Sequence, residues 1–298
     1  MLRSGPQGRR IAACGSMSDA LQPPRHPGHP DPLSAGERVL LLDRKARRYL
    51  VLLEAGAEWH SHKGLIAHDD IIGLPEGSTV RTTRNENLLV VRPTTGDYTL
   101  KSPRGAQVVY PKDQAMIVTL ADICPGATVV EAGAGSGALA ASLLRAVGPA
   151  GRVISFELRD EHADVAERNV RDRFGGMPAN WELRRGDVVE GLAGLDCDRI
   201  VLDLAEPWTV LKVAADALHP GGILLGYTPS VVQVMRLREA VDADARWGLA
   251  ATSETLVRGW HVDGQAVRPD HRMVAHTAFL TTARRLADPP VDAPSSIG

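Results

Sequence analysis

Short, apolar, β-like stretches occupy the chain from residue 32 to residue 110. Short apolar runs bounded by turn residues are typical of strands. Glycines between the stretches supply the turns. The pattern therefore predicts a small all-β domain at 32–110, with strands at 38–43, 48–53, 79–83, 88–92 and 98–100.

After residue 110 the pattern changes to strands that alternate with helices as far as residue 286. This order predicts a doubly wound, mostly parallel α/β sheet. We expect helices at 113–122, 137–147, 160–174, 208–218 and 231–241, and strands at 128–132, 152–157, 181–185, 199–204 and 222–227. Two further strand-like segments, around 254–262 and 276–284, suit an antiparallel edge of the same sheet.

Both ends of the chain have a different composition. Residues 1–31 are rich in proline, glycine, arginine and histidine, and residues 287–298 repeat proline and small residues. Such stretches bury little apolar surface, so we expect both ends to be disordered. A nucleic-acid-binding arm is the alternative interpretation of the first stretch.

The composition narrows the class of protein only slightly. A net charge of −2 and a hydrophobic fraction of 44% are typical of a soluble globular protein and give no global sign of nucleic-acid binding. Cys14, Cys124 and Cys197 are far apart and form no CxxC pair, which fits a reducing cytoplasm and predicts no thiolate metal site. No apolar run approaches the ~20 residues of a membrane span, and the N-terminus has no apolar core like that of a signal peptide.

The strongest local motif is the run Val130-Glu-Ala-Gly-Ala-Gly-Ser-Gly-Ala-Leu139, in which a buried strand leads through a glycine-rich turn into a helix. Gly133 and Gly135 allow a sharp turn and a close approach to a ligand. Glu157 ends the next strand, where a carboxylate accepts hydrogen bonds from ribose hydroxyls. This combination predicts a Rossmann-like nucleotide site and fits both NAD and S-adenosylmethionine.

Two later carboxylates favour the methyl donor. Asp187 follows the third strand, where it is placed to accept from an adenine amino group, and Asp203 follows the fourth strand, ahead of Pro207-Trp208. Both residues lie at the carboxyl edge of the predicted sheet, where ligands bind in open α/β folds. Taken singly, either aspartate is equally well interpreted as a helix N-cap.

Five motifs together resemble the tRNA (adenine-N1)-methyltransferases of the bacterial and archaeal type, and the actinobacterial members look most similar. The resemblance covers residues 32–286. The motifs are Tyr110-Pro-Lys-Asp, Glu131-Ala-Gly-x-Gly-Ser-Gly, Asp203-Leu-x-x-Pro-Trp, Tyr227-x-Pro-x-x-x-Gln233 and Ala275-His-Thr-Ala-Phe-Leu280.

The resemblance implies that the protein methylates N1 of the adenosine at position 58 in the tRNA T-loop, with S-adenosylmethionine as methyl donor, and that it is a homotetramer. It implies cofactor contacts from the glycine turn and the helix after it, together with Glu157, His162 and Asp187. It places Asp203 at the methyl-transfer centre, with Tyr110 and Tyr227 beside the target base. The expected cofactor-binding residues are Gly133, Gly135, Ser136, Gly137, Ala138, Leu139, Glu157, His162, Asp187 and Asp203.

The chemistry of adenine N1 fits these residues. N1 has an in-plane lone pair, so the protein must orient the base and stabilise the cation that forms, rather than supply a strong base. A carboxylate such as Asp203 has the right sign of charge and can accept from the N6 amine. Aromatic rings can hold an adenosine that is pulled out of folded RNA. A half-buried core ring is the alternative interpretation of each tyrosine.

Other functions remain less well supported by the sequence. An NAD-dependent oxidoreductase needs a hydride-handling acid or base, and nothing in the sequence nominates one. A methyltransferase with another acceptor and a non-catalytic tRNA-binding subunit are the remaining alternatives. His60 and His62, near His68, superficially resemble a metal site, but we expect no metal. Candidate phosphate contacts in the β domain are Arg44, Lys45, Arg47, Arg48, Arg81, Arg84, Lys101 and Arg104.

Overall fold

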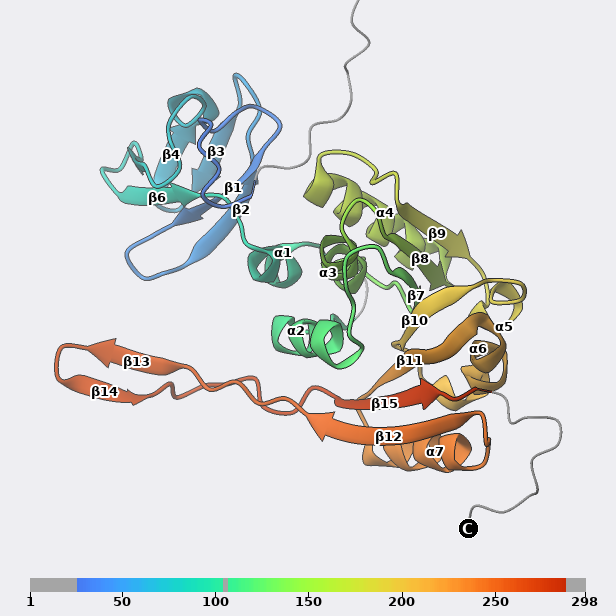
Figure 1. The fold of residues 1–298 in the computed structure, drawn as a ribbon. Helices are drawn as coiled ribbons and strands as arrows, with labels where there is room; N and C mark the ends of the chain where they lie inside the picture. Colours follow the sequence, from blue (N-terminus) through green and yellow to red (C-terminus); the bar gives the residue numbers. More distant parts are fainter. Residues whose placement is uncertain (1–25, 104–106, 288–298) are drawn as a thin grey trace, which may run out of the picture.

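The computed structural model describes residues 26–103 and 107–287. Figure 1 shows the strands β1 to β6 set apart in space from the seven-stranded sheet that forms later in the chain. The predicted disorder of residues 1–25 and 288–298 lies outside the described residues. None of the helices in the described ranges is long and apolar enough to cross a membrane.

The N-terminal part contains a four-stranded sheet in the order β2-β1-β6-β5 and a two-stranded sheet of β3 and β4. Alternate residues of β1 and β6 turn inward, so Val39, Leu41, Leu88 and Val90 are buried in one cluster. Successive side chains of a strand point to opposite faces, so residues two apart share the buried face. The strands are β1 (Arg38–Leu42), β2 (Arg48–Leu52), β3 (Glu58–Ser61), β4 (Gly64–Ala67), β5 (Thr79–Arg81) and β6 (Asn87–Val91), with a 3-10 turn η1 (His68–Asp70).

The strand expected at 98–100 was wrong, because these residues lie in helix α1 (Thr95–Lys101). Thr94 caps this helix: its hydroxyl accepts from the Asp97 N–H, and the Asp97 carboxylate accepts from the Thr94 N–H. This reciprocal capping box stabilises a short helix that apolar periodicity alone does not predict.

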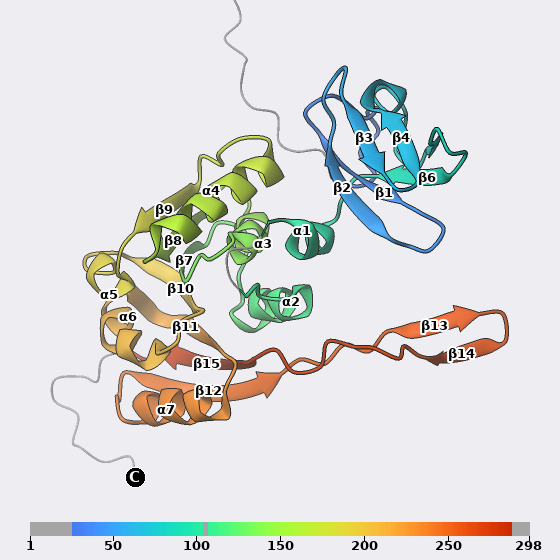
Figure 2. The ribbon, with the colours of Figure 1, turned by 180° about the vertical axis from the view of Figure 1, so that it is seen from behind.

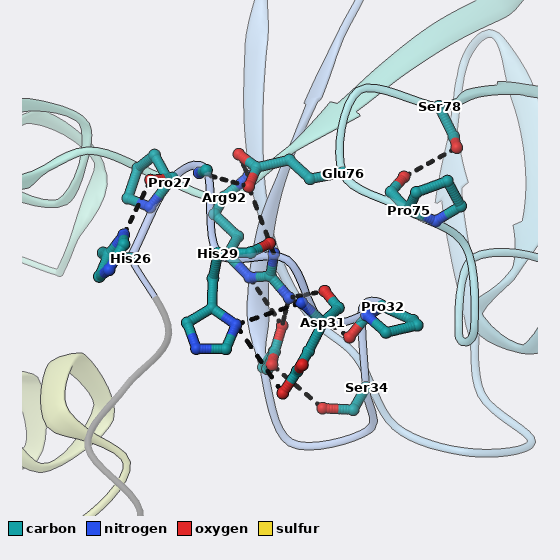
Figure 3. Close-up of polar contacts among 12 residues, drawn as sticks. His26, Pro27, His29, Asp31, Pro32, Ser34, Pro75, Glu76, Ser78 and Arg92 are labelled. Atoms are coloured by element: carbon teal, nitrogen blue, oxygen red, sulfur yellow. Dashed lines mark hydrogen bonds and ion pairs between the residues drawn. The ribbon is translucent and has the colours of Figure 1, made fainter.

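Arg92 joins the residues before the first strand to the sheet (Figure 3). Its side chain is 2% exposed and pairs with the carboxylates of Glu37 and Glu76. The same guanidinium donates to the backbone carbonyls of His29, Asp31 and Pro32. Residues 26–31 were expected to be disordered like the rest of the N-terminus. In the structure, two of their backbone carbonyls, those of His29 and Asp31, accept hydrogen bonds from the buried Arg92 guanidinium.

The second sheet has seven strands in the order β12-β15-β11-β10-β7-β8-β9. The five strands from β11 to β9 in this order run parallel, whereas β15 is antiparallel to both β11 and β12. The sheet is therefore doubly wound, with the antiparallel edge that the sequence predicts. Its strands are β7 (Thr128–Ala132), β8 (Arg152–Glu157), β9 (Trp181–Arg185), β10 (Cys197–Leu202), β11 (Leu218–Thr228), β12 (Trp247–Glu254) and β15 (Phe279–Arg285).

Helices cover both faces of this sheet (Figures 1 and 2). Val129 and Val130 are neighbours on β7 and belong to different buried clusters, because successive side chains of a strand point to opposite faces. The first face packs against α2 (Pro111–Leu120), α3 (Ala138–Val147) and α4 (Asp160–Phe174). The second packs against α5 (Val188–Gly191), η2 (Pro207–Val210), α6 (Leu211–Ala217) and α7 (Val231–Asp242).

Residues 255–278 form an arm between β12 and β15 that projects away from the sheet in both views. At its tip, β13 (Trp260–Asp263) and β14 (Ala266–Pro269) pair only with each other among the described strands. The strand expected around 254–262 was therefore wrongly placed. The sheet strand β12 ends at Glu254, and β13 belongs to the arm.

Candidate active site

A cavity of about 370 Å³ opens at the carboxyl ends of β7, β8, β9 and β10. Four of the residues predicted from strand ends line it: Gly133, Glu157, Asp187 and Asp203. Parallel strands bring their carboxyl ends to one edge of a sheet, so residues up to 70 positions apart in sequence meet there.

Gly133 makes the closest approach between two of these loops. It has φ +89°, and a Cβ built on it would lie 2.2 Å from the carbonyl oxygen of Asp203. The Asp203 N–H in turn donates to the carbonyl of Ala132 at 2.9 Å. The contact between the loops after β7 and β10 therefore requires a glycine at position 133, whether or not a ligand is bound.

Glu157 is 5% exposed and holds the glycine turn in place. Its Oε2 accepts from the Gly135 N–H at 2.9 Å, and its Oε1 accepts from the Arg159 N–H at 3.1 Å. Carboxylates have further lone pairs available, so Glu157 can also accept from a diol in the cavity.

Asp203 is half-buried, and burial raises its pKa to about 7, with the negative charge of Glu157 as the second cause. Glu131, on β7, is fully buried and accepts from the Ser155 hydroxyl at 2.5 Å. Burial raises the pKa of Glu131 to about 8, and Asp203 and Glu157 raise it further. The sequence motif contained Glu131, but its role as a third interacting carboxyl group was not predicted.

Asp187 is a helix N-cap, the alternative that the sequence left open for it, and it also faces the cavity. Its side chain caps α5 by accepting from the Val189 N–H at 2.8 Å. It is also exposed and lines the cavity. Leu158, next to Glu157, was missed by the sequence analysis. Its side chain is 73% exposed at the cavity, where a flat apolar ring could pack.

The other predicted cofactor residues do not line this cavity. Ser136, Gly137 and Ala138 border a separate hollow together with Tyr98 and Arg173 of the α1–α4 side. Leu139 is buried in the core, and His162 is buried with no hydrogen-bond partner for Nδ1 among the described residues.

The two predicted tyrosines lie on the α2 side of the sheet. Tyr110 is the N-cap of α2, and Tyr227, near the end of β11, is 5% exposed. Burial raises the pKa of Tyr227, with further increases from the negative charges of Asp113 and Asp203 and a smaller influence of Tyr110. Neither tyrosine lines the cavity that contains Asp203.

Comparisons with known proteins decide the family. Residues 87–270 match the model of the tRNA methyltransferase complex GCD14 subunit, and residues 32–80 match a TrmI-like N-terminal model. The chain is also 42% identical, over 247 residues, to the tRNA (adenine(58)-N(1))-methyltransferase TrmI of Thermus thermophilus, covering 83% of this chain and 96% of that one. The chain belongs to the tRNA (adenine-N1)-methyltransferase family.

Two solved structures are similar to this family member. The tRNA (m1A58) methyltransferase TrmI of Aquifex aeolicus superposes with a TM-score of 0.75 and 28% identity, covering 87% of this chain and 100% of that one. A protein of Thermotoga maritima described as a SAM-dependent O-methyltransferase superposes with a TM-score of 0.82 and 31% identity, covering 87% and 97%. The predicted Rossmann-like fold with an N-terminal β part is confirmed.

The methyl donor of the family is S-adenosylmethionine, and the cavity of this family member fits it. Glu157, Asp187 and Asp203 contribute carboxyl groups, and Arg159 is the only basic residue among the described residues that line the cavity. Its Nε lies 3.7 Å from Glu157. An excess of carboxyl groups favours a cationic ligand, as a sulfonium compound is. The described residues contain no cluster of three or more metal-ligating side chains.

Proposed function

We propose that this protein methylates N1 of the adenosine at position 58 in the T-loop of tRNA, with S-adenosylmethionine as the methyl donor. The observation that carries the proposal is the convergence of Glu157, Asp187 and Asp203 on one cavity in a member of this family. Since tRNA is the substrate, we place the protein in the cytoplasm.

S-adenosylmethionine, when bound, supplies an electrophilic methyl group on a sulfonium. Glu157 binds the ribose hydroxyls and Asp187 the adenine amino group, because both are acceptors at the cavity wall. Gly133 and Gly135 leave room beside them for the ligand. The remaining contacts that we assign to this ligand come from Ser136, Gly137, Ala138, Leu139 and His162.

The target adenosine is bound on the Asp203 side of the cavity. Asp203 accepts from the N6 amine, which orients N1 toward the methyl group and stabilises the positive charge that develops on the base. Tyr110 and Tyr227 hold the extruded base. Gln233 keeps the loop after Asp203 in place, because its Nε2 donates to the Ala205 carbonyl at 2.8 Å.

We propose further that the protein is a homotetramer and that the arm of residues 255–278 packs against another copy. The arm exposes apolar side chains along its length, although a monomeric soluble protein rarely exposes a large apolar patch. The most exposed are Leu256, Val257, Trp260, Val262 and Val267, each more than half accessible.

The test uses methyl-labelled S-adenosylmethionine and two tRNA transcripts, one unmodified and one with adenosine 58 replaced. Label in the first transcript alone, recovered as 1-methyladenosine after digestion, is the expected result. Label in both transcripts would show that the protein is a methyltransferase but would contradict position 58 as its target. Binding of the methyl donor without any label would favour another acceptor or a non-catalytic subunit.

A further inference from the structure

Two polar contacts fix the side chain of His276 at the arm root, which we define as residues 254–255 and 276–277. Its Nδ1 lies 2.7 Å from Oε1 of Glu254, the last residue of β12, and its Nε2 lies 2.8 Å from the carbonyl oxygen of Pro229. The ring also packs against Phe279, with 4.8 Å between the ring centroids. His276 therefore joins the two legs of the arm to the loop that follows β11.

Lys112 anchors the same arm root to α2. Its side chain is 7% exposed, and its ammonium group donates to Asp113 Oδ1 at 2.7 Å, to the Thr255 carbonyl at 2.8 Å and to Thr277 Oγ1 at 2.5 Å. An ammonium group has three N–H donors, so each one has an acceptor. Because this anchor does not involve His276, the arm root stays attached to α2 when the contacts of the histidine are removed.

Both ring nitrogens of His276 carry a proton in this arrangement. A carbonyl oxygen only accepts hydrogen bonds, and so does a carboxylate at neutral pH. A neutral imidazole has one N–H, so it could donate to only one of Glu254 and Pro229 and would turn a lone pair toward the other. The two contacts together therefore describe an imidazolium.

The charges around the ring agree with this protonation state. The hydrogen bond to Pro229 raises the pKa of His276 above its ordinary value, and Glu254 on β12 raises it further. Partial desolvation and the positive charge of Lys112 on α2 oppose the increase. A group with a raised pKa keeps its proton near neutral pH and loses it, together with one of its contacts, at alkaline pH.

The peptide bond between Pro229 and Ser230 extends these contacts toward the cavity. Its carbonyl faces the histidine ring, and its N–H donates to Oε1 of Gln233 at 3.0 Å. Gln233 in turn donates from Nε2 to the carbonyl oxygen of Ala205 at 2.8 Å. Ala205 lies two residues after Asp203, and both line the cavity. Contacts thus run without a break from the arm root to the cavity wall.

The same contacts join three motifs that the sequence presents separately. Asp203-Leu-x-x-Pro-Trp contains Ala205, Tyr227-x-Pro-x-x-x-Gln233 contains Pro229 and Gln233, and Ala275-His-Thr-Ala-Phe-Leu280 contains His276. The last of these motifs has no residue in the wall of the cavity. Its histidine instead reaches the cavity through the other two motifs.

We propose that His276 is a positioning residue that fixes the loop carrying Asp203 from the arm root, through the 229–230 peptide and Gln233 and without touching either substrate. The inference rests on the proposed function, in which Asp203 orients the target adenosine. When the ring loses a proton at alkaline pH, it no longer donates to both Glu254 and Pro229. The loop is then held less firmly, and methylation slows.

The first test compares kcat for tRNA methylation with the Kd for S-adenosylmethionine. The side chain of His276 is 45% exposed, so solvent weakens its contacts and a moderate effect follows. We expect His276→Ala to lower kcat about fivefold and to change the Kd less than twofold. Because the effect passes through Gln233, His276→Ala should lower kcat little further in a Gln233→Ala background.

The second test separates the charge of the ring from its contacts. In Glu254→Gln, the amide can donate to Nδ1 of a neutral His276 while the Nε2–H still donates to Pro229. Both contacts then survive without the imidazolium. We expect the unaltered protein to lose kcat at alkaline pH and Glu254→Gln to lack this loss. At neutral pH, kcat of Glu254→Gln should exceed that of His276→Ala.

His219→Ala is the matched control. His219 is also an exposed histidine beside a carboxylate, with Nδ1 3.5 Å from Asp198 Oδ1, but it lies at the amino end of β11, whereas the cavity lies at the carboxyl ends of the parallel strands. We expect its kcat and pH profile to equal those of the unaltered protein. If thermal denaturation shows that His276→Ala does not fold, His276→Gln, which keeps an amide donor, takes its place with a smaller expected loss.

The outcomes separate the two proposals. Three results would each overturn the positioning role of His276 while leaving the proposed function intact: an unchanged kcat for His276→Ala, additive losses with Gln233→Ala, or the same pH profile for Glu254→Gln and the unaltered protein. Absence of methylation by the unaltered protein would overturn the proposed function and the inference that rests on it.

Discussion

The carbonyl oxygen of Asp203 lies 2.2 Å from where the Cβ of a non-glycine residue would lie at position 133. The loop after β7 and the loop after β10 are therefore in backbone contact, and the carboxyl group of Asp203 is positioned by a residue that has no side chain. The glycine-rich turn is thus in direct backbone contact with the loop that carries Asp203, the residue that we place at the reaction centre.

We expect Gly133→Ala to displace the Asp203 loop, lowering the Tm and reducing methylation more than tenfold. Gly126→Ala is the matched control, because its φ of +90° is equally unfavourable but its Cβ would meet nothing within 4 Å. A left-handed backbone costs a non-glycine residue about 1–2 kcal/mol. Thermal denaturation and labelled-methyl transfer measure both variants, and equal losses would contradict the loop contact.

Asp203→Ala should bind S-adenosylmethionine almost normally but lose most of its turnover, because the acceptor for the N6 amine is removed. Calorimetry measures the first property and labelled-methyl transfer the second. Unchanged turnover, or loss of the folded state, would contradict the role of Asp203.

The pKa of Asp203 predicts a pH dependence. The pKa of the Asp203 carboxyl group in the free protein is about 7, so the ionised fraction of Asp203 rises between about pH 6 and pH 8. We expect kcat/KM for the methyl donor to rise over the same range. A bound cation favours the carboxylate, so the rise in kcat should lie at lower pH than the rise in kcat/KM. The Asp203→Asn variant should lack both rises, and a profile identical to that of the unaltered protein would assign the titration to another group.

Glu131 should make the protein less stable as the pH rises. Its folded-state pKa of about 8 lies above the ordinary value of 4.5, so the folded protein keeps a proton that the unfolded chain releases. The free energy of unfolding therefore falls between pH 4.5 and 8, by up to about 1.4 kcal/mol per pH unit.

The Glu131→Gln variant should flatten this fall and exceed the unaltered protein in stability near pH 8. Urea unfolding at several pH values measures the slope. Glu190→Gln removes an exposed carboxyl group on α5 and should leave the slope as it is. If both variants keep the original slope, Glu131 is not the group responsible.

Trp260→Asp should dissociate the proposed tetramer, because it places a charge on the most exposed aromatic face of the arm. Sedimentation equilibrium measures the mass. Leu249→Ser is the control, since Leu249 is 80% exposed but lies on β12 outside the arm. An unchanged mass for Trp260→Asp would place the interface elsewhere.

The sequence predicted the central elements well because they obey local rules. Strands 152–157 and 181–185 and helix 160–174 occur at the predicted bounds. Residues 98–100 of helix α1 were predicted as a strand, although the Thr94–Asp97 capping box is visible in the sequence. Propensity is a weak guide for a segment this short.

The site was predictable only in part. Strand-end acids such as Glu157 and Asp203 follow from the topology of a parallel sheet. The contacts of Lys112 with Thr255 and Thr277 join residues 143 and 165 positions apart, and no periodicity encodes them. The side-chain chemistry was visible in the motifs, but only the folded chain brings these groups together.

The carbonyl acceptors of Arg92 also show that the folded unit includes residues ahead of β1. A shortened chain starting at Arg38 would retain every strand but would lose the carbonyls of His29, Asp31 and Pro32 and the carboxylate of Glu37. A guanidinium that is 2% exposed would then keep Glu76 but lose its other partners. The irregular segment before the first strand therefore belongs to the folded domain, and a shortened chain that lacked residues 29–37 would leave a buried cation with fewer acceptors.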